Sequence, residues 1–266
     1  MSAPETVVAL RAAGCVFAEE EAGLIHAAAA TVSDVRRMVA ERVSGRPLEQ
    51  VLGWAEFDGL RITVAPGVFV PRRRSRLLVD LAAERAAALE HAVVVDLCCG
   101  TGALAAATLA RVPSADVYAA DLDPAAVACA RRNLPPHRVF EGDLFAALPH
   151  DLRGRVDVLL VNAPYVPTEA IATMPPEARD HEHRTALDGG PDGLDVQRRV
   201  IEHAASWLAP GGDLLIETGR HQVPATSAAM TRAGLAAELH TLADLDSVAV
   251  RGRVRRSDPQ TPVLHG

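Results

Sequence analysis

The sequence contains no lysine, few aromatic residues and few cysteines. Phe, Trp and Tyr make up 3% of its 266 residues, so the core must be built mainly from Ala, Val and Leu. The four cysteines, Cys15, Cys98, Cys99 and Cys129, lack the spacing of metal ligands. This cysteine usage is typical of a reduced cytoplasmic protein and argues against a disulfide-linked secreted one.

Long apolar runs and an excess of positive charge are absent as well. No stretch approaches the ~20 apolar residues of a membrane span. The first residues, MSAPETVVALRAAG, lack the basic and apolar regions of a signal peptide. The formal net charge of −7 disfavours nucleic acid as a general partner, because basic residues that neutralise phosphates supply most non-specific affinity. We therefore expect a cytoplasmic protein with no membrane association and no nucleic acid as its direct substrate.

The N-terminal part of the chain predicts a small helical region followed by a hairpin. The segments ETVVALRAAG and TVSDVRRMVAERVSG are typical of helices that end at or near a glycine. The starts of these helices carry no clear capping signal. A capping box with Ser33 as its first residue would need an acidic residue or glutamine three positions later, where the sequence has Arg36. Residues 46–71 alternate in polarity and contain the turn signals Asp58-Gly59 and Pro66-Gly67.

From residue 92 onward, strands and helices alternate. The short apolar runs AVVVDL, ADVYAAD, HRVFEGD, VDVLLVN and GDLLIET suit strands that are buried on both faces of a parallel sheet. Helices are predicted for SRLLVDLAAERAAALE and for Ala103–Arg111, Pro124–Asn133 and Leu194–Leu208, and loops for PDGLD and MPPEARDHEHR. Residues 237–255 predict antiparallel strands at the sheet edge. The fold class is therefore α/β.

The first apolar run leads into a glycine-containing turn, Asp96-Leu97-Cys98-Cys99-Gly100-Thr101-Gly102, and then into a helix. Glycines let a backbone approach a ligand, and a helix N-terminus offers free amides. The next two runs end in Asp121 and Asp143, and an acidic residue after the second strand is where a ribose diol is held. A dinucleotide site would need a third glycine, but Ala105 follows. Acidic residues at three successive strand ends favour S-adenosylmethionine over NAD(P) as the ligand. The other interpretation is that this segment is a glycine turn of an α/β sheet that binds no ligand.

Six segments, in order, resemble the HemK/PrmC-type protein N5-glutamine methyltransferases. They are GRPLEQVLGWAEFDGLRITVAPGVFVPRRRSR, VVDLCCGTGALA, YAADLDPAAV, VNAPYVP, HEHRTALDGGPDGLDVQRRVI and LLIETGRHQ. That family methylates the glutamine of the Gly-Gly-Gln motif in peptide chain release factors, or a glutamine in a ribosomal protein. Its fold is a helical N-terminal substrate-recognition domain, a β-hairpin linker and a Rossmann-like methyltransferase domain. For this chain the resemblance implies boundaries at residues 1–45, 46–76 and 77–266.

The resemblance also implies roles for individual residues. Asp96 and the Cys98–Gly102 loop would hold the methionine part of S-adenosylmethionine, Asp121 the ribose, and Asp143 with Leu144 the adenine. Asn162-Ala163-Pro164-Tyr165 takes the place of the family's Asn-Pro-Pro-Tyr and would bind the substrate, and Asn162 would also contact the cofactor. Asn162, Pro164 and Tyr165 are the expected catalytic residues, and no metal is expected.

The tetrad suits a reaction at an amide nitrogen, although an asparagine after a strand is also a common turn former. An amide nitrogen is a poor nucleophile, because its lone pair is shared with the carbonyl group. The side-chain oxygen of Asn162 and the carbonyl of Ala163 would accept its two N–H bonds and turn the lone pair toward the methyl group. Pro164 restricts the residue before it to extended geometry, which aims that carbonyl. Tyr165 would stack on the amide or face the sulfonium.

Three departures from the family pattern keep alternatives open. Ala163 replaces a proline, which removes a lock on its φ angle but leaves the carbonyl. Cys98 replaces a glycine, which costs roughly 1 kcal/mol if its φ is positive. The run Arg72–Arg76 replaces Arg-Pro-Glu-Thr-Glu and is either a solvated linker or a patch for an acidic or phosphate-bearing partner. The alternatives are an N6-adenine methyltransferase and a degenerate cofactor-binding paralogue.

The segment RDHEHR invites a metal hypothesis because His181 and His183 flank Glu182. The spacing is wrong for ligands on one helical face, so we expect a loop of solvated charges. Glu182 matches an acidic residue of the resembled family and is a candidate for orienting an arginine or the substrate.

Overall fold

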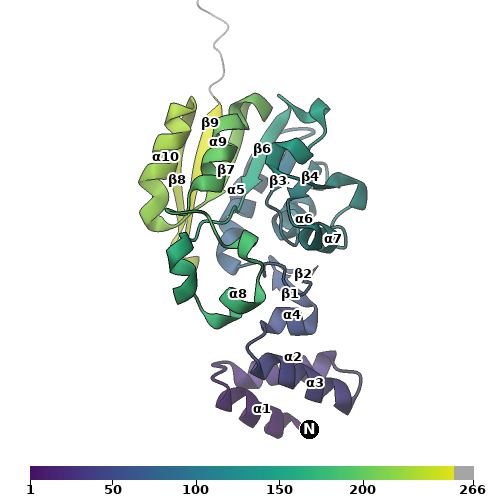
Figure 1. Ribbon diagram of the computed structural model, residues 1–266. Helices are drawn as coiled ribbons and strands as arrows, with labels where there is room; N and C mark the ends of the chain where they lie inside the picture. The colour runs from purple at the N-terminus through teal and green to yellow at the C-terminus, as the bar shows by residue number, and fades with distance from the viewer. Residues whose placement is uncertain (255–266) are drawn as a thin grey trace, which may run out of the picture.

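The computed structural model describes residues 1–254, whose centre is a seven-stranded sheet with the order β5-β4-β3-β6-β7-β9-β8 (Figure 1). The strands are β3 (Val93–Leu97), β4 (Asp116–Asp121), β5 (Val139–Glu141), β6 (Val156–Val161), β7 (Leu208–Glu217), β8 (Leu235–Leu242) and β9 (Ser247–Val254). The first five are parallel, whereas β9 runs antiparallel to both β7 and β8. The expected α/β class, including its antiparallel C-terminal strands, is confirmed.

Helices cover both faces of this sheet. One face packs against α5 (Arg76–Ala87), α6 (Ala103–Arg111) and α7 (Pro124–Ala130), and the other against α9 (Asp195–Trp207) and α10 (Val223–Arg232). Successive strand residues alternate between the two cores: Leu159 packs with α9 and Leu160 with α5 and α6. This alternation explains why the strands are apolar at nearly every position.

The connections change direction at the centre of the sheet. From β3 the chain proceeds outward through β4 to β5, whereas β6 returns to the other side of β3 and leads to β7. Leu97 and Val161 are paired in the register of β3 and β6, so both strands end at the same edge. Ligands of open α/β sheets bind at such a switch point, beyond the carboxyl ends of the strands.

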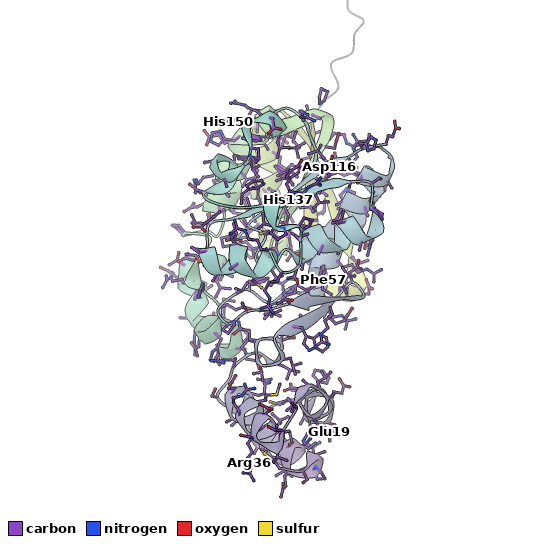
Figure 2. The ribbon with its side chains drawn as sticks, turned by 90° about the vertical axis from the view of Figure 1, so that its right-hand side faces the viewer. Glu19, Arg36, Phe57, Asp116, His137 and His150 are labelled. Atoms are coloured by element: carbon purple, nitrogen blue, oxygen red, sulfur yellow. The ribbon has the colours of Figure 1, made fainter. Side chains whose placement is uncertain are left out.

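Four N-terminal helices form a group at one end of the molecule: α1 (Ala3–Ala12), α2 (Ala18–Ala28), α3 (Val32–Val43) and α4 (Leu48–Leu52). They share an apolar core of their own, to which Leu10, Ile25 and Met38 contribute. Figure 2 shows Glu19 and Arg36 on this group, at the far end of the molecule from His150.

Helix α3 begins with a capping box that the sequence analysis missed. The Thr31 side chain accepts a hydrogen bond from the Asp34 amide at 3.1 Å, and Asp34 Oδ2 accepts one from the Thr31 amide at 3.0 Å. The expectation that this helix begins without a capping signal was wrong, because its N-cap residue, Thr31, lies two residues before Ser33. Asp34 replaces the usual Glu or Gln of the box.

The hairpin β1 (Trp54–Phe57) and β2 (Leu60–Thr63) connects this group to the sheet. Its turn residues Asp58 and Gly59 have φ values of 53° and 77°, as a two-residue hairpin turn requires. Gln50 Nε2 donates to the carbonyls of Val68 and His181 at 3.2 and 3.1 Å, which ties α4 to two distant segments.

One expected loop is partly helical. Helix α8 (Pro176–His181) forms within MPPEARDHEHR. Pro176 occupies the first turn, where its missing N–H costs nothing. In residues 1–254, no helix has the length and apolar character needed to cross a membrane.

Candidate active site

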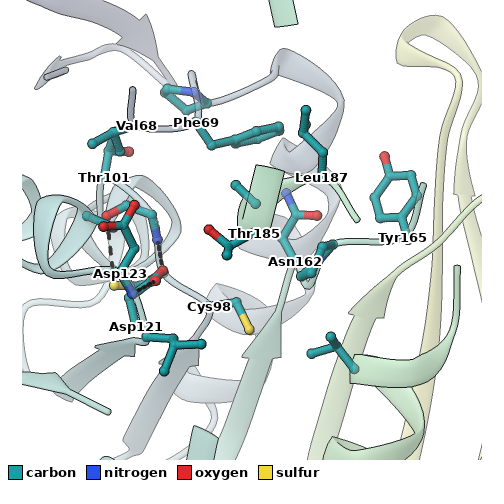
Figure 3. Close-up of a pocket in the computed structure, with 18 of the residues that line it drawn as sticks. Val68, Phe69, Cys98, Thr101, Asp121, Asp123, Asn162, Tyr165, Thr185 and Leu187 are labelled. Atoms are coloured by element: carbon teal, nitrogen blue, oxygen red, sulfur yellow. Dashed lines mark hydrogen bonds between the residues drawn. The ribbon is translucent and has the colours of Figure 1, made fainter. Parts of the chain in front are cut away.

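A cavity of about 200 Å³ opens at the switch point, beyond the carboxyl ends of β3, β4, β5 and β6. Ten of the predicted site residues line it: Cys98, Cys99, Gly100, Thr101, Asp121, Asp143, Leu144, Asn162, Pro164 and Tyr165. Asp96, Gly102 and Ala163 lie behind its wall. In Figure 3, Asn162 and Cys98 lie between Asp121 and Asp123 on one side and Tyr165 on the other. The topology therefore brings segments from four strand ends into one site.

Asp96 is fully buried beneath the loop that follows β3. Its Oδ2 accepts a hydrogen bond from the Ala105 amide at 3.2 Å, which fixes the start of α6 against the strand. Its Oδ1 is buried and has no partner among the described residues. Burial raises the pKa of Asp96 to about 8, since a charged carboxylate is poorly solvated there. Asp96 thus keeps one oxygen without a partner directly behind the cavity.

The loop itself contains three left-handed residues. Cys98, Gly100 and Gly102 have φ values of 58°, 55° and 74°. A Cβ at Gly102 would lie 2.8 Å from a side-chain carbon of Leu134, whereas one at Gly100 would meet open space. Because the φ of Cys98 is positive, the cysteine in place of the family's glycine strains the backbone. Such strain costs roughly 1 kcal/mol for a residue with a side chain.

Asp121 lies at the end of β4 and faces the cavity. Its two oxygens accept hydrogen bonds from the Gly100 amide at 2.8 Å and the Asp123 amide at 2.9 Å. Burial raises the pKa of Asp121. A carboxylate has about four lone-pair sites, so Asp121 retains acceptors for two hydroxyl groups of a ligand.

Asp143 and Leu144 line the cavity just after β5. Asp143 Oδ2 accepts a hydrogen bond from Arg199 Nη2 at 2.5 Å, and this contact joins the loop to α9. Leu144 has a positive φ of 49° and packs against the core beneath α9. The pair offers an apolar surface beside a polar group, which suits a nucleobase.

Asn162 presents one face of its amide to the cavity. Its Nδ2 donates to Ser75 Oγ at 3.3 Å, whereas its Oδ1 has no hydrogen bond within the described residues. The backbone carbonyl of Ala163 likewise accepts no hydrogen bond from residues 1–254. These two oxygens are the pair for which the sequence predicts a role as acceptors, and neither has a partner among the described residues.

Tyr165 is held by residues that the sequence analysis did not identify. Its hydroxyl donates to Glu217 Oε1 at 3.1 Å and accepts a hydrogen bond from Arg74 Nη2 at 2.5 Å. Its carbonyl accepts a hydrogen bond from Gln222 Nε2 at 2.9 Å. Burial is the main cause that raises the pKa of the Tyr165 hydroxyl, so the phenol is protonated at neutral pH.

The arginine run forms ion pairs within the protein. Arg72 contacts Glu182 at 2.6 Å, Arg74 contacts Glu217 at 3.2 Å, and Arg76 lies 3.5 Å from Asp58. Three of the four arginines in the run therefore have carboxylate partners within the protein, while Arg73 is exposed. Glu182 is buried, so the expectation of a loop of solvated charges was wrong for this residue, and its candidate role of orienting an arginine is confirmed.

The residues present fit an adenosyl cofactor. Asp96 has an unpaired buried oxygen, Asp121 has spare acceptors at a strand end, and a Cβ at Gly100 would point into open space. A phosphate group would meet two carboxylates, Asp121 and Asp123, at this end of the cavity (Figure 3). The donor set therefore suits a nucleoside without phosphates better than a dinucleotide.

Comparison with known proteins agrees with this chemistry. The family model described as "Methyltransferase small domain" matches residues 59–177. A release factor glutamine methyltransferase from Geobacter sulfurreducens is 38% identical over 203 residues, covering 75% of this chain and 70% of that protein. Further relatives with the same name are 40% identical.

A relative with a different name is as similar. The 4-amino-L-phenylalanine/4-methylamino-L-phenylalanine methyltransferase from Streptomyces pristinaespiralis is 38% identical, over 74% of this chain and 69% of that protein. Among solved structures, a methyltransferase from Pyrococcus furiosus has a TM-score of 0.54 at 17% identity, covering 75% of this chain and 90% of that one. That likeness shows the methyltransferase fold, and the sequence relatives show more: this chain belongs to the release factor glutamine methyltransferase family.

Proposed function

We propose that the protein transfers a methyl group from S-adenosylmethionine to the side-chain amide nitrogen of the glutamine in the Gly-Gly-Gln motif of a peptide chain release factor. The observation that carries this proposal is the pair of unused acceptors, Asn162 Oδ1 and the Ala163 carbonyl, beside a cavity with acidic strand ends. A primary amide offers two N–H donors, which match this pair. A release factor as substrate would place the enzyme in the cytoplasm.

In this proposal the two ends of the cavity have different tasks. Asp96 and the loop after it, Asp121, and Asp143 with Leu144 would hold the cofactor, which supplies an electrophilic methyl group when bound. Asn162 and Ala163 would hold the glutamine nitrogen with its lone pair toward that methyl group, so that the reaction proceeds from an aligned geometry. No histidine lines the part of the cavity that the structure describes, and none is needed if the proton leaves after the transfer.

We also propose that residues 1–45 recognise the protein substrate, that residues 46–76 are a linker, and that the methyltransferase domain begins at residue 77. Support comes from the separate apolar core of the N-terminal helices and from exposed apolar side chains on them. Val8, Val16, Phe17, Leu24, Val32 and Val43 are all large apolar residues with high exposure. These side chains offer apolar area that contact with a protein substrate would bury.

The proposed function is tested by supplying methyl-labelled S-adenosylmethionine with a release factor, 4-amino-L-phenylalanine or an adenine-containing oligonucleotide. Label on the Gly-Gly-Gln glutamine, located by mass spectrometry, supports the proposal. Label on the aromatic amine or on adenine contradicts it. Tight cofactor binding without transfer to any acceptor would indicate a degenerate paralogue.

Asn162→Ala should lower turnover at least about 100-fold, because misaligned reactants commonly lose that much rate. Affinity for S-adenosylhomocysteine, measured by calorimetry, should stay within a few-fold of the original, since the acidic strand ends are unchanged. Turnover near that of the unaltered enzyme would contradict the role of the two acceptors.

A further inference from the structure

Three side chains from distant segments meet at the substrate end of the cavity. Arg74 belongs to the short 3₁₀ segment Arg73–Ser75, Tyr165 follows β6, and Glu217 ends β7. Arg74 Nη2 lies 2.5 Å from the Tyr165 hydroxyl, Arg74 Nε lies 3.2 Å from Glu217 Oε1, and the hydroxyl lies 3.1 Å from the same oxygen. Each group contacts both others, so the ring of Tyr165 is fixed at its outer end.

Arg74 and Glu217 depend on each other. Glu217 is 4% exposed, and its second carboxylate oxygen is buried without a hydrogen bond in the described chain. A buried carboxylate without a cation is strongly destabilising. Arg74 is the only cation that forms an ion pair with Glu217 within residues 1–254. The guanidinium has donors for both partners, because its N–H groups form a rigid fork.

The protonation of Tyr165 fixes the direction of its hydrogen bond. Burial and the neighbouring Glu217 carboxylate both raise the pKa of the phenol, while Arg74 opposes them. The hydroxyl therefore keeps its proton, donates it to Glu217 and accepts from Arg74. This arrangement allows one orientation of the hydroxyl and restricts rotation of the ring.

We propose that Arg74 and Glu217 are positioning residues that hold the ring of Tyr165 against the substrate amide. This inference rests on the proposed function, since it assigns the two residues to that same site. In the family that the sequence resembles, an acidic residue usually stands at position 74. The arginine here supplies the cation that Glu217 requires, so the departure is part of this positioning device and is no sign of a degenerate site.

The kinetic test compares substitutions at the two positions. Arg74→Met and Glu217→Gln should each lower kcat about 10- to 100-fold with the KM for S-adenosylmethionine unchanged, as expected for misplaced reacting groups. Arg74→Lys should restore part of kcat, because one ammonium reaches one of the two partners. Arg74→Glu should lower kcat at least as far as Arg74→Met, because it sets two carboxylates against each other.

Arg73→Met is the matched control. Arg73 lies in the same segment, is exposed, and has no side-chain hydrogen bond or ion pair in the described part of the chain. Its kcat should stay within twofold of the unaltered enzyme. Thermal unfolding and binding of S-adenosylhomocysteine show whether each variant is folded.

A spectroscopic readout separates this inference from the proposed function. The chain has two tyrosines, so protein labelled with ¹³C at the tyrosine Cζ gives two signals, and Tyr118→Phe assigns them. Glu217→Gln and Arg74→Met should shift the Tyr165 signal and leave the Tyr118 signal in place. If no acceptor is methylated, the proposed function fails while this signal still tests the contacts of Tyr165.

Two results would overturn the inference. One is a kcat within twofold of the unaltered enzyme for both Arg74→Met and Glu217→Gln, with an unshifted Tyr165 signal. The other is an unchanged kcat with a raised KM for the methyl acceptor in Arg74→Met alone, which would make Arg74 a direct substrate ligand.

Discussion

At the scale of single residues, Ala163 offers a clear test of rigidity in the site. Its amide donates no hydrogen bond to the described residues, so a proline there would remove no bond. Ala163→Pro should raise the free energy of unfolding by ~0.4–1 kcal/mol, because proline reduces the freedom of the unfolded chain. Urea unfolding of the two proteins measures the difference. A lower stability would mean that the buried site has no room for the ring.

The site residues divide according to how they could be found from sequence. Asp96, Asp121 and Asn162 each end an apolar run, so the strand pattern alone marks them. Ser75 has no such signal, and Glu217 ends the apolar run GDLLIET without any sign in the sequence of what it contacts. Their roles arise because the sheet order places β7 beside β6, and because the segment before α5 crosses the ends of both strands. Contacts between residues 52 positions apart, such as Tyr165 and Glu217, leave no local pattern.

At the scale of elements, local signals determined how well each segment was predicted. Helix α6 has the expected bounds, since a glycine turn precedes it and a proline follows soon after it. Helix α8 was missed because it has only six residues and is rich in charge. It contacts the N-terminal group through Glu177, which pairs with Arg42 at 2.7 Å. Tertiary contacts of this kind stabilise helices too short to form alone.

The N-terminal helices carry a prediction about substrate recognition. Val16 and Phe17 are adjacent and 84% and 64% exposed. Replacing both with serine should raise the KM for an intact release factor about tenfold or more, because apolar contact area is lost. Steady-state kinetics with a short Gly-Gly-Gln peptide should show no change, since a peptide would not reach these helices.

Leu239→Ser provides the control for the substitutions at Val16 and Phe17. Leu239 is 51% exposed but lies on β8, at the opposite edge of the sheet from β5. Its KM for the release factor should stay unchanged. Equal effects of the two sets of substitutions would show that the N-terminal helices have no special role in recognition.

At the scale of the whole molecule, buried carboxyl groups link stability to pH. Burial raises the pKa of Asp96 to about 8 and also raises the pKa values of Asp121 and Glu182. Between the ordinary pKa of an aspartate and about 8, the folded state therefore keeps a proton that the unfolded state has lost. Stability falls as pH rises through this window, by up to about 1.4 kcal/mol per pH unit for one such group.

We therefore expect the free energy of unfolding of the cofactor-free protein to decrease from pH 5 to pH 7, by an amount on the order of 2 kcal/mol for Asp96. Surface carboxyl groups with lowered pKa values, such as Asp34 and Asp188, lose their stabilising effect only at more acidic pH. His240 opposes the trend, because burial lowers its pKa. Urea unfolding of Asp96→Asn isolates the contribution of Asp96, since asparagine is neutral throughout. An Asp96→Asn protein with the same pH dependence as the original would show that Asp96 is ionised in the folded, cofactor-free state.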